Sequence, residues 1–232
     1  MLEQIYISGD YQERNPTWHI EESTWKARQV IRMLRSDHID PKTICEVGCG
    51  AGEVLFQLQK SMNDNCLFWG YDISPHALEL SKGKTNARLK FKLGDIRKEK
   101  DNFFDIILIM DVIEHLEDYY GFLRDLKPMS HYKILHIPLD LSVQTVLRRS
   151  GLSDVRLTYG HLHYFTKEIA LQMLKDVGYD VIDYCYTARA LEIPTKDIKR
   201  KLMKLPRKLL SVVDKDMAAR ILGGWSLLAL TQ

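Results

Sequence analysis

A glycine-rich loop with flanking acids is the part of the chain best suited to chemistry. A short apolar run contains Glu46 and leads directly into Gly48, Gly50 and Gly52. Glycines let a backbone turn tightly and approach a bound ligand. Twenty residues after Gly52, a second apolar run ends in Asp72, where a carboxylate at the tip of the next parallel strand can bind ribose hydroxyls. Together the two features predict a nucleoside cofactor.

The spacing of the glycines separates two cofactor classes. Dinucleotide-binding loops use Gly-x-Gly-x-x-Gly, so that a pyrophosphate rests on the amides of the next helix. Here the third glycine comes one residue early and Glu53 follows it. Acids at this position and at Glu46 repel phosphate but attract the amino and sulfonium cations of S-adenosylmethionine (SAM). The loop therefore favours SAM over NAD, with a purely structural glycine turn as the alternative that Asp72 argues against.

Several motifs in order resemble those of class I, Rossmann-like, SAM-dependent methyltransferases, and in particular the type 11/12, UbiG-like small-molecule subset. The resemblance spans roughly residues 43–178, and its later motifs are Gly94-Asp-Ile96 and Asp111-Val-Ile-Glu-His115. In the family pattern Asp72 binds the ribose, and the acid of the third motif, with its apolar neighbour, binds the adenine. The resemblance implies SAM as cofactor, with S-adenosylhomocysteine (SAH) as product, held by Glu46, Gly48, Cys49, Gly50, Gly52, Asp72, Ile73, Asp95, Ile96, Met110, Asp111 and Val112.

The elements that must position these residues alternate along the chain. Strand-like runs recur near 43–48, 66–72, 88–93, 103–110 and 132–138, with helix-like stretches between them. Such alternation predicts an α/β fold with a parallel sheet between two helical layers. The resemblance completes this as a three-layer αβα sandwich whose seven-stranded, mostly parallel sheet has an antiparallel terminal strand.

The domain organisation expected from this pattern has two parts. We expect residues 1–40 to form an N-terminal helical cap on the acceptor side. Residues 41–232 should form the Rossmann-like SAM-binding catalytic domain, with a helical insertion near 139–160 and a basic helical insertion near 190–222.

Three histidines are candidates for removing a proton from a hydroxyl acceptor. His115 follows the fourth strand, and His161 and His163 lie in the segment Tyr159–Thr166, which resembles a family segment that closes over the active site. We interpret His161 as a structural part of that closing segment and favour His163 as the base. The alternative for His115 is that the Glu-His pair only caps the next helix. The alternative for His161 and His163 is that they belong to an ordered loop with a purely structural role.

Aromatic residues on either side of the sheet motifs are expected to bind the acceptor, because the Rossmann core supplies only the cofactor half. These are Tyr11, Trp18, His19, Tyr159 and Tyr164. For Trp18 the alternative is that it merely seats the N-terminal segment on the core. The acid-rich turn Asp111–Glu117 offers Mg²⁺ ligands, but acidic turns are usually solvated surface, so no metal is predicted.

The segment Lys196–Lys208 carries seven basic residues against one acid. Ile198, Leu202, Leu205 and Leu209 recur at near-helical spacing, and Pro206 is expected to break any long helix. The segment could dock on the core with its charges in water, lie weakly on a membrane surface, or bind nucleic acid, and we favour these in that order. The net charge of only +2 and the absence of an RNA-binding motif count against nucleic acid.

Composition limits the functional classes. A chain of 232 residues with 45% apolar content can bury a substantial core. It has no apolar run of membrane-spanning length and no signal-peptide pattern at its start, so a cytoplasmic location is expected. Its four cysteines form no metal-binding motif, which excludes radical SAM chemistry.

Three functional classes remain. The first is a methyltransferase acting on a small molecule, most simply on oxygen, in natural-product, saccharide or other secondary metabolism. The second is a methyltransferase acting on RNA or a peptide, and the third is a SAM-binding module without catalysis. Neither the acceptor nor the oligomeric state can be read from the sequence.

Overall fold

The computed structural model describes residues 4–99 and 102–232. Its first residues, 1–3, belong to the predicted N-terminal cap and lie outside the described part. Seven strands form one sheet in the order β3-β2-β1-β4-β5-β7-β6. The strands are β1 (Thr43–Val47), β2 (Leu67–Asp72), β3 (Leu89–Leu93), β4 (Phe104–Met110), β5 (Ser130–Pro138), β6 (Val181–Thr187) and β7 (Ser226–Thr231).

The sheet topology confirms the predicted fold. Strands β1 to β5 pair in parallel, while β7 lies between β5 and β6 and runs antiparallel to both. The order reverses beside β1, whose neighbours are β2 on one side and β4 on the other. Ligands of such sheets bind beyond the carboxyl ends of the strands at this reversal.

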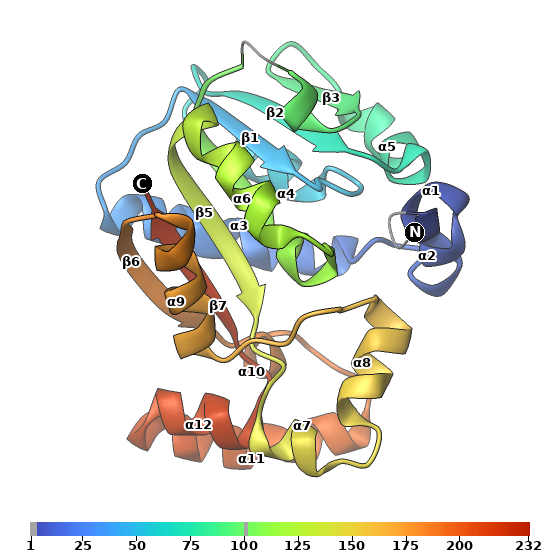
Figure 1. The fold of residues 1–232 in the computed structure, drawn as a ribbon, viewed down its shortest axis with the longest axis vertical. Coiled ribbons are helices and arrows are strands. Elements are labelled where there is room, and N and C mark those ends of the chain that lie inside the picture. The colour runs from blue at the N-terminus through green and yellow to red at the C-terminus, as the bar shows by residue number, and fades with distance from the viewer. Residues whose placement is uncertain (1–3, 100–101) are drawn as a thin grey trace.

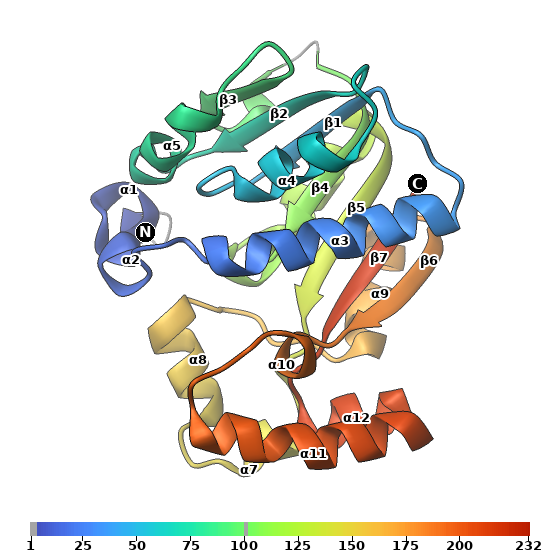
Figure 2. The same cartoon turned by 180° about the vertical axis from the view of Figure 1, so that it is seen from behind.

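Helices cover both faces of the sheet (Figures 1 and 2). On one face lie α3 (Ile20–Ser36) and α4 (Glu53–Ser61), whose apolar residues pack on alternate positions of β4 such as Ile106 and Leu108. On the other lie α6 (Tyr119–Leu126) and α9 (Lys167–Val177), packed on Ile107 and Ile109. This alternation is the two-residue period of a strand buried on both faces.

Side chains and a glycine define the ends of two helices. Helix α5 (Pro75–Ser81) begins at Ser74, whose hydroxyl accepts from the Ala77 amide, with proline as its first residue. Helix α9 begins at Thr166 and ends at Gly178, which has a φ of 92°.

Beyond the carboxyl edge of the sheet lies a lobe of short helices (Figure 1). Two follow β5, α7 (Val143–Leu147) and α8 (Gly151–Tyr159), and three follow β6, α10 (Arg189–Glu192), α11 (Ile198–Val213) and α12 (Lys215–Leu222). Helix α7 contacts both α8 and α12, so the two insertions form one unit. At the other end of the chain, α1 (Gln4–Ser8) and α2 (Asp10–Arg14) approach the same edge.

Two expectations for the basic segment are wrong. Helix α11 runs through Pro206 without ending, because it is held on both sides: Lys204 donates to the carbonyls of Leu191 and Ile193, and Arg207 donates to those of Leu222 and Gly223. The helix also docks on the lobe through a different face from the one expected, which was its apolar face. The four apolar residues at helical spacing are 62–72% exposed, whereas Arg207 is buried.

Among the described residues, no helix combines the length and the apolarity needed to cross a bilayer.

Candidate active site

The glycine loop after β1 is fastened to the end of β2. The amides of Gly48 and Cys49 donate to the carbonyl of Tyr71, and the Gly50 amide donates to Oδ2 of Asp72 at 2.8 Å. Gly48 has a φ of 70°, and a Cβ there would lie 2.7 Å from the Val112 side chain. Glycine is required because any side chain would be strained and would collide with the segment after β4.

Asp72 is held rigidly at the tip of β2. Its Oδ1 accepts from the Ser74 amide at 2.8 Å, opposite the Gly50 contact on Oδ2, and the residue is only 7% exposed. Burial raises the pKa of Asp72, although its backbone donors oppose the rise. An ionised carboxylate offers about four acceptor sites, so Asp72 retains capacity for further donors.

Glu46 is a buried acid without a full set of partners. It lies in β1, is 2% exposed, and its Oε2 has no hydrogen-bond partner in the described part of the chain. Burial raises the pKa of Glu46 to about 8, with the nearby Lys26 opposing the rise and Asp72 and Asp111 adding to it. A buried, unpaired acceptor of this kind is costly, and a cationic ligand group would relieve that cost.

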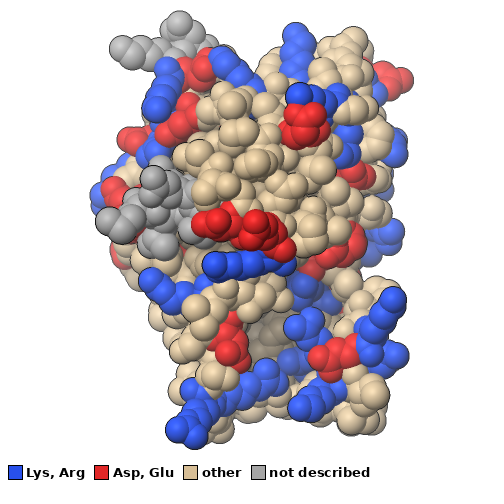
Figure 3. Space-filling model, turned by 90° about the vertical axis from the view of Figure 1, so that its right-hand side faces the viewer, with Lys and Arg blue, Asp and Glu red and all other residues tan. Residues whose placement is uncertain are grey.

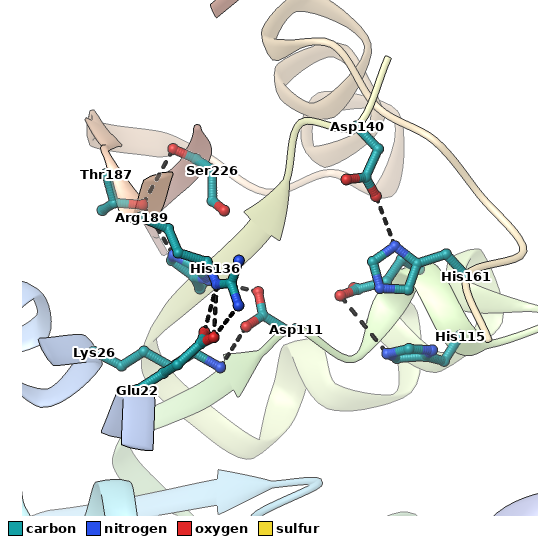
Figure 4. Close-up of polar contacts among 11 residues, drawn as sticks. Glu22, Lys26, Asp111, His115, His136, Asp140, His161, Thr187, Arg189 and Ser226 are labelled. Atoms are coloured by element: carbon teal, nitrogen blue, oxygen red, sulfur yellow. Dashed lines mark hydrogen bonds and ion pairs between the residues drawn. The ribbon is translucent and has the colours of Figure 1, made fainter. Parts of the chain in front are cut away.

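Asp111, just after β4, is the centre of a polar network (Figure 4). Lys26 of α3 lies 2.5 Å from its Oδ2, and Nδ1 of His136 on β5 lies 2.5 Å from its Oδ1. The other ring nitrogen of His136 contacts the Thr187 hydroxyl at 2.9 Å. Burial opposes ionisation, but His136 and Lys26 hold the pKa of Asp111 well below its usual value. The φ of Asp111 is 57°, a strained conformation for this residue type that the network maintains.

A second network joins the helical lobe to α3. Arg189 of α10 forms an ion pair with Glu22, which is nearly buried. Glu192 of α10 accepts from Nε1 of Trp25 at 2.8 Å and from Nε2 of Gln29 at 3.1 Å. These contacts place the Arg189 side chain beside the Asp111 network (Figure 4).

A third cluster contains Glu114, His115 and His161. Their potential ligand atoms all lie within 4.8 Å of one another. Glu114 is 0% exposed, and neither of its carboxylate oxygens has a hydrogen-bond partner among the residues described. Nδ1 of His161 contacts Oδ2 of Asp140 at 2.6 Å (Figure 4). Burial lowers the pKa of His115 to about 3, so its imidazole is neutral at physiological pH.

Aromatic side chains from the N-terminal helices and α8 wall the remaining side. The ring of Tyr11 lies 4.8 Å from that of Tyr6 and 5.0 Å from that of Trp18. The Tyr11 hydroxyl lies 3.3 Å from Nε2 of His19, whose ring lies 5.9 Å from that of Tyr159. These rings give the wall both apolar faces and polar tips.

Members of each of these groups line one cavity of about 340 Å³, among them Glu46, Asp72, Asp111, Arg189, His161 and Tyr11. Figure 3 shows a hollow on this side of the molecule, between the part that carries the sheet and the lower helical lobe. The cavity therefore lies beyond the carboxyl ends of β1, β2, β4 and β5, where the topology predicts a ligand site.

Comparison with known proteins identifies the family. A family model described as a methyltransferase domain matches residues 39–222. The chain belongs to this methyltransferase domain family. Norajmaline N-methyltransferase of Rauvolfia serpentina is 29% identical over 113 residues, which cover 43% of this chain and 38% of the plant protein. The human tRNA N(3)-cytidine methyltransferase METTL6 is 24% identical over 233 residues, covering 88% of this chain and 81% of the human protein.

Solved structures share the fold of this methyltransferase domain. Magnesium protoporphyrin IX methyltransferase from Synechocystis, solved with bound SAH, has a TM-score of 0.60 and 17% identity, with 90% of this chain and 82% of that chain covered. At this identity the likeness concerns the fold. The matches span only 31–42% of the length of three of the curated relatives.

Most of the residues predicted from the sequence line the cavity of the methyltransferase domain. On the cofactor side these are Glu46, Gly48, Cys49, Gly50, Asp72, Ile73, Met110, Asp111 and Val112, and on the opposite side Tyr11, Trp18, His19, Tyr159, His115 and His161. The structure thus brings together segments separated by more than a hundred residues.

Three residues predicted to bind the cofactor lie outside the cavity lining. Gly52 precedes α4, and a Cβ there would meet Phe91. Asp95 accepts from the amide and guanidinium of Arg97, and Ile96 is buried in the core under α6. The third motif thus forms a turn and packs in the core, and its contact with the adenine stays a prediction.

The structure does not support His163 and Tyr164 as site residues. Nε2 of His163 lies 2.8 Å from the carbonyl of Leu116, and its ring packs on Tyr119. The Tyr164 hydroxyl donates to the carbonyl of Leu152. Neither residue lines the cavity. The structure therefore favours His161 over His163 as the base, because the ring of His161 lines the cavity whereas that of His163 is held against the Leu116 carbonyl and Tyr119.

Sequence reasoning missed several cavity residues: Tyr6, Glu22, Lys26, His136, Asp140 and Arg189. His136 carried a signal, since it is a polar residue within the otherwise apolar run of β5. Lys26 and Arg189 look like surface cations in the sequence, and only tertiary packing reveals their role.

Proposed function

We propose that this chain is a SAM-dependent methyltransferase that acts on a small-molecule acceptor, most simply at an oxygen. The observation that carries the proposal is that Glu46 and Asp72, carboxylates on adjacent strands, face one cavity beside the glycine loop. The residues Gly48, Cys49, Gly50, Ile73, Met110, Asp111 and Val112 complete this cofactor half.

The charges of the site fit this cofactor. Asp72 keeps acceptor capacity for two ribose hydroxyls beyond its contacts with the Gly50 and Ser74 amides. Glu46 offers an unpartnered oxygen to the ammonium group of the methionine part. When bound, SAM supplies an activated methyl group on a cationic sulfur. A pyrophosphate has no hydrogen-bond donor for the unpartnered oxygen of Glu46, which favours SAM over NAD.

The opposite wall fits a compact acceptor with aromatic or polar character. Tyr11, Trp18, His19 and Tyr159 enclose the cavity there, and Arg189 and Lys26 add positive charge that is already balanced by Glu22 and Asp111. Methyl transfer is an in-line displacement, so the main task of this wall is to align acceptor and methyl group. A hydroxyl acceptor must also lose its proton, and His115 and His161 are the imidazoles on the cavity wall that can assist.

Thermal melting with candidate cofactors tests the proposal. SAH at a large excess over its dissociation constant should raise the melting temperature, because a ligand that binds only the folded state stabilises it. NAD at the same concentration should leave it unchanged. The reverse result would assign the cavity to a dinucleotide and remove the proposal.

An RNA acceptor is the second candidate. It is favoured by the relative that acts on tRNA, since that match covers 88% of this chain and 81% of the relative. The basic helix α11 would then contact the RNA backbone. Labelled methyl transfer to total tRNA, competed against small hydroxylated and amine compounds, separates the two candidates.

A further inference from the structure

The cluster of Glu114, His115 and His161 is not explained by cofactor binding. Its members come from two segments, the short turn Ile113–His115 after β4 and the loop after α8. Glu114 is fully buried, yet both of its oxygens lack hydrogen-bond partners in the part of the chain described. Leaving a buried carboxylate unpaired costs several times a normal hydrogen bond. Burial raises the pKa of Glu114 well above its usual value, so the carboxyl is costly to ionise in the ligand-free protein, and a bound cation would stabilise its ionised form.

The geometry of the cluster is that of a three-ligand metal site. Oε1 of Glu114 lies 3.8 Å from Nε2 of His115, and all three potential ligand atoms fall within 4.8 Å. In a tetrahedral site, two ligands each about 2.0–2.2 Å from the ion lie about 3.3–3.6 Å apart, so a bound ion would draw the more widely spaced atoms of this cluster together. Asp140 contacts Nδ1 of His161 at 2.6 Å, which leaves Nε2 of the ring available, as in the carboxylate–histidine pairs that orient metal ligands.

We propose that Glu114, His115 and His161 bind one divalent transition-metal ion, with Asp140 as the residue that orients His161. Two imidazoles and one carboxylate suit Zn²⁺ or Mn²⁺ better than Mg²⁺, which prefers oxygen ligands. His115, His161 and Asp140 line the cavity. An ion held by three protein ligands would keep a position for a further ligand, which an acceptor in the cavity could take.

The role that we assign to this metal ion rests on the proposed methyltransferase function. A hydroxyl acceptor bound to the ion would lose its proton more easily, because a bound cation lowers the pKa of a coordinated hydroxyl. Acceptor oxygen and ion would form a coordination bond, and the proton would pass to solvent. His115 and His161 would then act as ligands, and neither would need to serve as a free base.

Equilibrium dialysis of chelator-treated protein against Zn²⁺, Mn²⁺ or Mg²⁺ alone tests the site directly. We expect one Zn²⁺ or Mn²⁺ per chain and much weaker binding of Mg²⁺. Glu114→Gln keeps the shape of the side chain but should abolish the stoichiometric binding. Asp140→Asn should weaken it about 10- to 100-fold, the usual effect of losing an orienting partner.

Two control variants match these changes. Glu46→Gln alters a different buried acid with an unpartnered oxygen, one that lines the cavity, and His163→Asn alters a nearby histidine that does not line it. Both should retain one ion per chain. Glu114→Gln without metal should melt at or above the temperature of the metal-free wild type, because it removes an unpaired buried carboxylate. That readout separates loss of the site from loss of the fold.

The outcomes distinguish this site from the cofactor proposal. Metal binding lost in Glu114→Gln with SAH binding intact supports the site, and chelation should then stop methyl transfer without changing SAH affinity. Absence of stoichiometric binding, or binding unchanged in Glu114→Gln and His161→Asn, overturns the metal site and leaves the cofactor proposal standing. Failure of SAH binding alone would instead remove the methyltransferase proposal.

The outer face of α11 carries a second, independent inference. Its apolar residues Ile198, Leu202, Leu205, Leu209, Val212 and Val213 are 62–84% exposed. At about 100° per residue they occupy a single face of the helix. Exposed Lys199, Lys201 and Lys208 flank this face, and buried Arg207 fastens the opposite side to the lobe. The helix therefore presents an apolar stripe with Lys199 along one border and Lys201 and Lys208 along the other.

We infer that this face lies on an anionic membrane surface. An apolar stripe bordered by lysines is the arrangement that inserts shallowly among lipid headgroups, with the ammonium groups meeting the lipid phosphates. The charges favour an anionic bilayer over an uncharged partner surface, because each lysine near such a surface contributes about 1 kcal/mol.

Vesicle flotation tests this surface. The protein should float with vesicles containing phosphatidylglycerol and not with pure phosphatidylcholine vesicles. Replacing Lys199, Lys201 and Lys208 by Gln, or Leu202 and Leu205 by Gln, should abolish flotation. The matched triple variant Lys90→Gln, Lys98→Gln and Lys175→Gln, which changes exposed lysines elsewhere, should not.

Flotation that is absent, or equal on neutral vesicles, overturns the inference. The inference is also overturned if sedimentation shows a dimer and the two leucine substitutions dissociate it. In that case a second copy of the chain covers the apolar stripe.

Discussion

The cofactor half of the cavity is built from neighbouring segments, whereas the acceptor half is assembled from distant ones. Glu46, the glycine loop and Asp72 lie within a single strand-helix-strand unit and are tied together by backbone hydrogen bonds. The acceptor half takes Tyr11 from α2, Lys26 from α3 and Arg189 from α10. A motif can therefore encode the first half, while the second depends on how the N-terminal helices and the lobe pack.

The two halves also differ in how their charges are satisfied. On the acceptor side, Glu22 and Arg189 form an ion pair, and Lys26 and His136 satisfy both carboxylate oxygens of Asp111 in the cofactor half. On the cofactor side Glu46 has an oxygen without a partner, and Glu114 between the halves has two. These paired groups serve structure and alignment, and the open carboxylates mark the places where ligands should supply charge.

The largest expected effect comes from blocking the glycine loop. Gly50→Val should abolish SAM binding, because its φ of 52° disfavours a branched residue and the new side chain would enter the cavity. The nearest atom to a Cβ there is Trp18 Cε3 at 3.5 Å, so the protein should still fold. Gly83→Val is the control, since a Cβ there meets nothing within 4 Å. Calorimetry with SAM compares the two, and normal binding by Gly50→Val would exclude the loop as the site.

Loss of His161 should act on the reaction and spare the cofactor. His161→Asn should lower turnover about 10²- to 10⁴-fold while SAM affinity stays within a factor of two. His163→Asn should change turnover little, because its ring bonds the Leu116 carbonyl outside the cavity. Steady-state kinetics of both variants decide between the two histidines. Equal losses in the two would contradict the distinction drawn from the cavity.

The pH dependence of stability should report on Glu46. The pKa of Glu46 in the folded state is about 8, above its value in the unfolded chain. The favourable contribution of Glu46 to folding stability is therefore fully present below about pH 4.5 and is lost as the pH rises toward 8. Glu46→Gln should therefore stabilise the ligand-free protein at pH 8 relative to wild type, on the order of 1–3 kcal/mol, and do little at pH 5. Urea unfolding at the two pH values measures this difference. An equal effect at both pH values would mean that Glu46 is already paired.

The smallest effect tests the assembly of the acceptor half. Trp25→Phe removes the Nε1 hydrogen bond to Glu192 and should lower the free energy of unfolding by about 0.5–1.5 kcal/mol. The acceptor KM should rise while SAM affinity is unchanged, because α3 and α10 together position Arg189. A change in SAM affinity of the same size would show that the two halves are not separable.

Sequence reasoning reached the sheet and the cofactor half because their signals are local. Apolar runs, glycines and terminal acids lie in the order in which the strands form, and helix ends such as Ser74 and Thr166 carry their own caps. Sequence reasoning failed where tertiary packing decides which way a side chain or a helix face points. A two-residue spacing would place His161 and His163 on the same side of an extended loop, but packing turns His161 toward Asp140 and His163 toward the Leu116 carbonyl. Likewise α11 docks through Arg207 instead of its leucines.

The measurement that most directly tests the central claim is the calorimetric affinity for SAM of wild type and Asp72→Ala. The claim predicts a single SAM site in the wild type and a loss of about 1.5–3 kcal/mol of binding free energy in the variant, because charged acceptors make the stronger hydrogen bonds to ribose. Unchanged SAM affinity in a folded Asp72→Ala protein would contradict the assignment of this cavity to SAM.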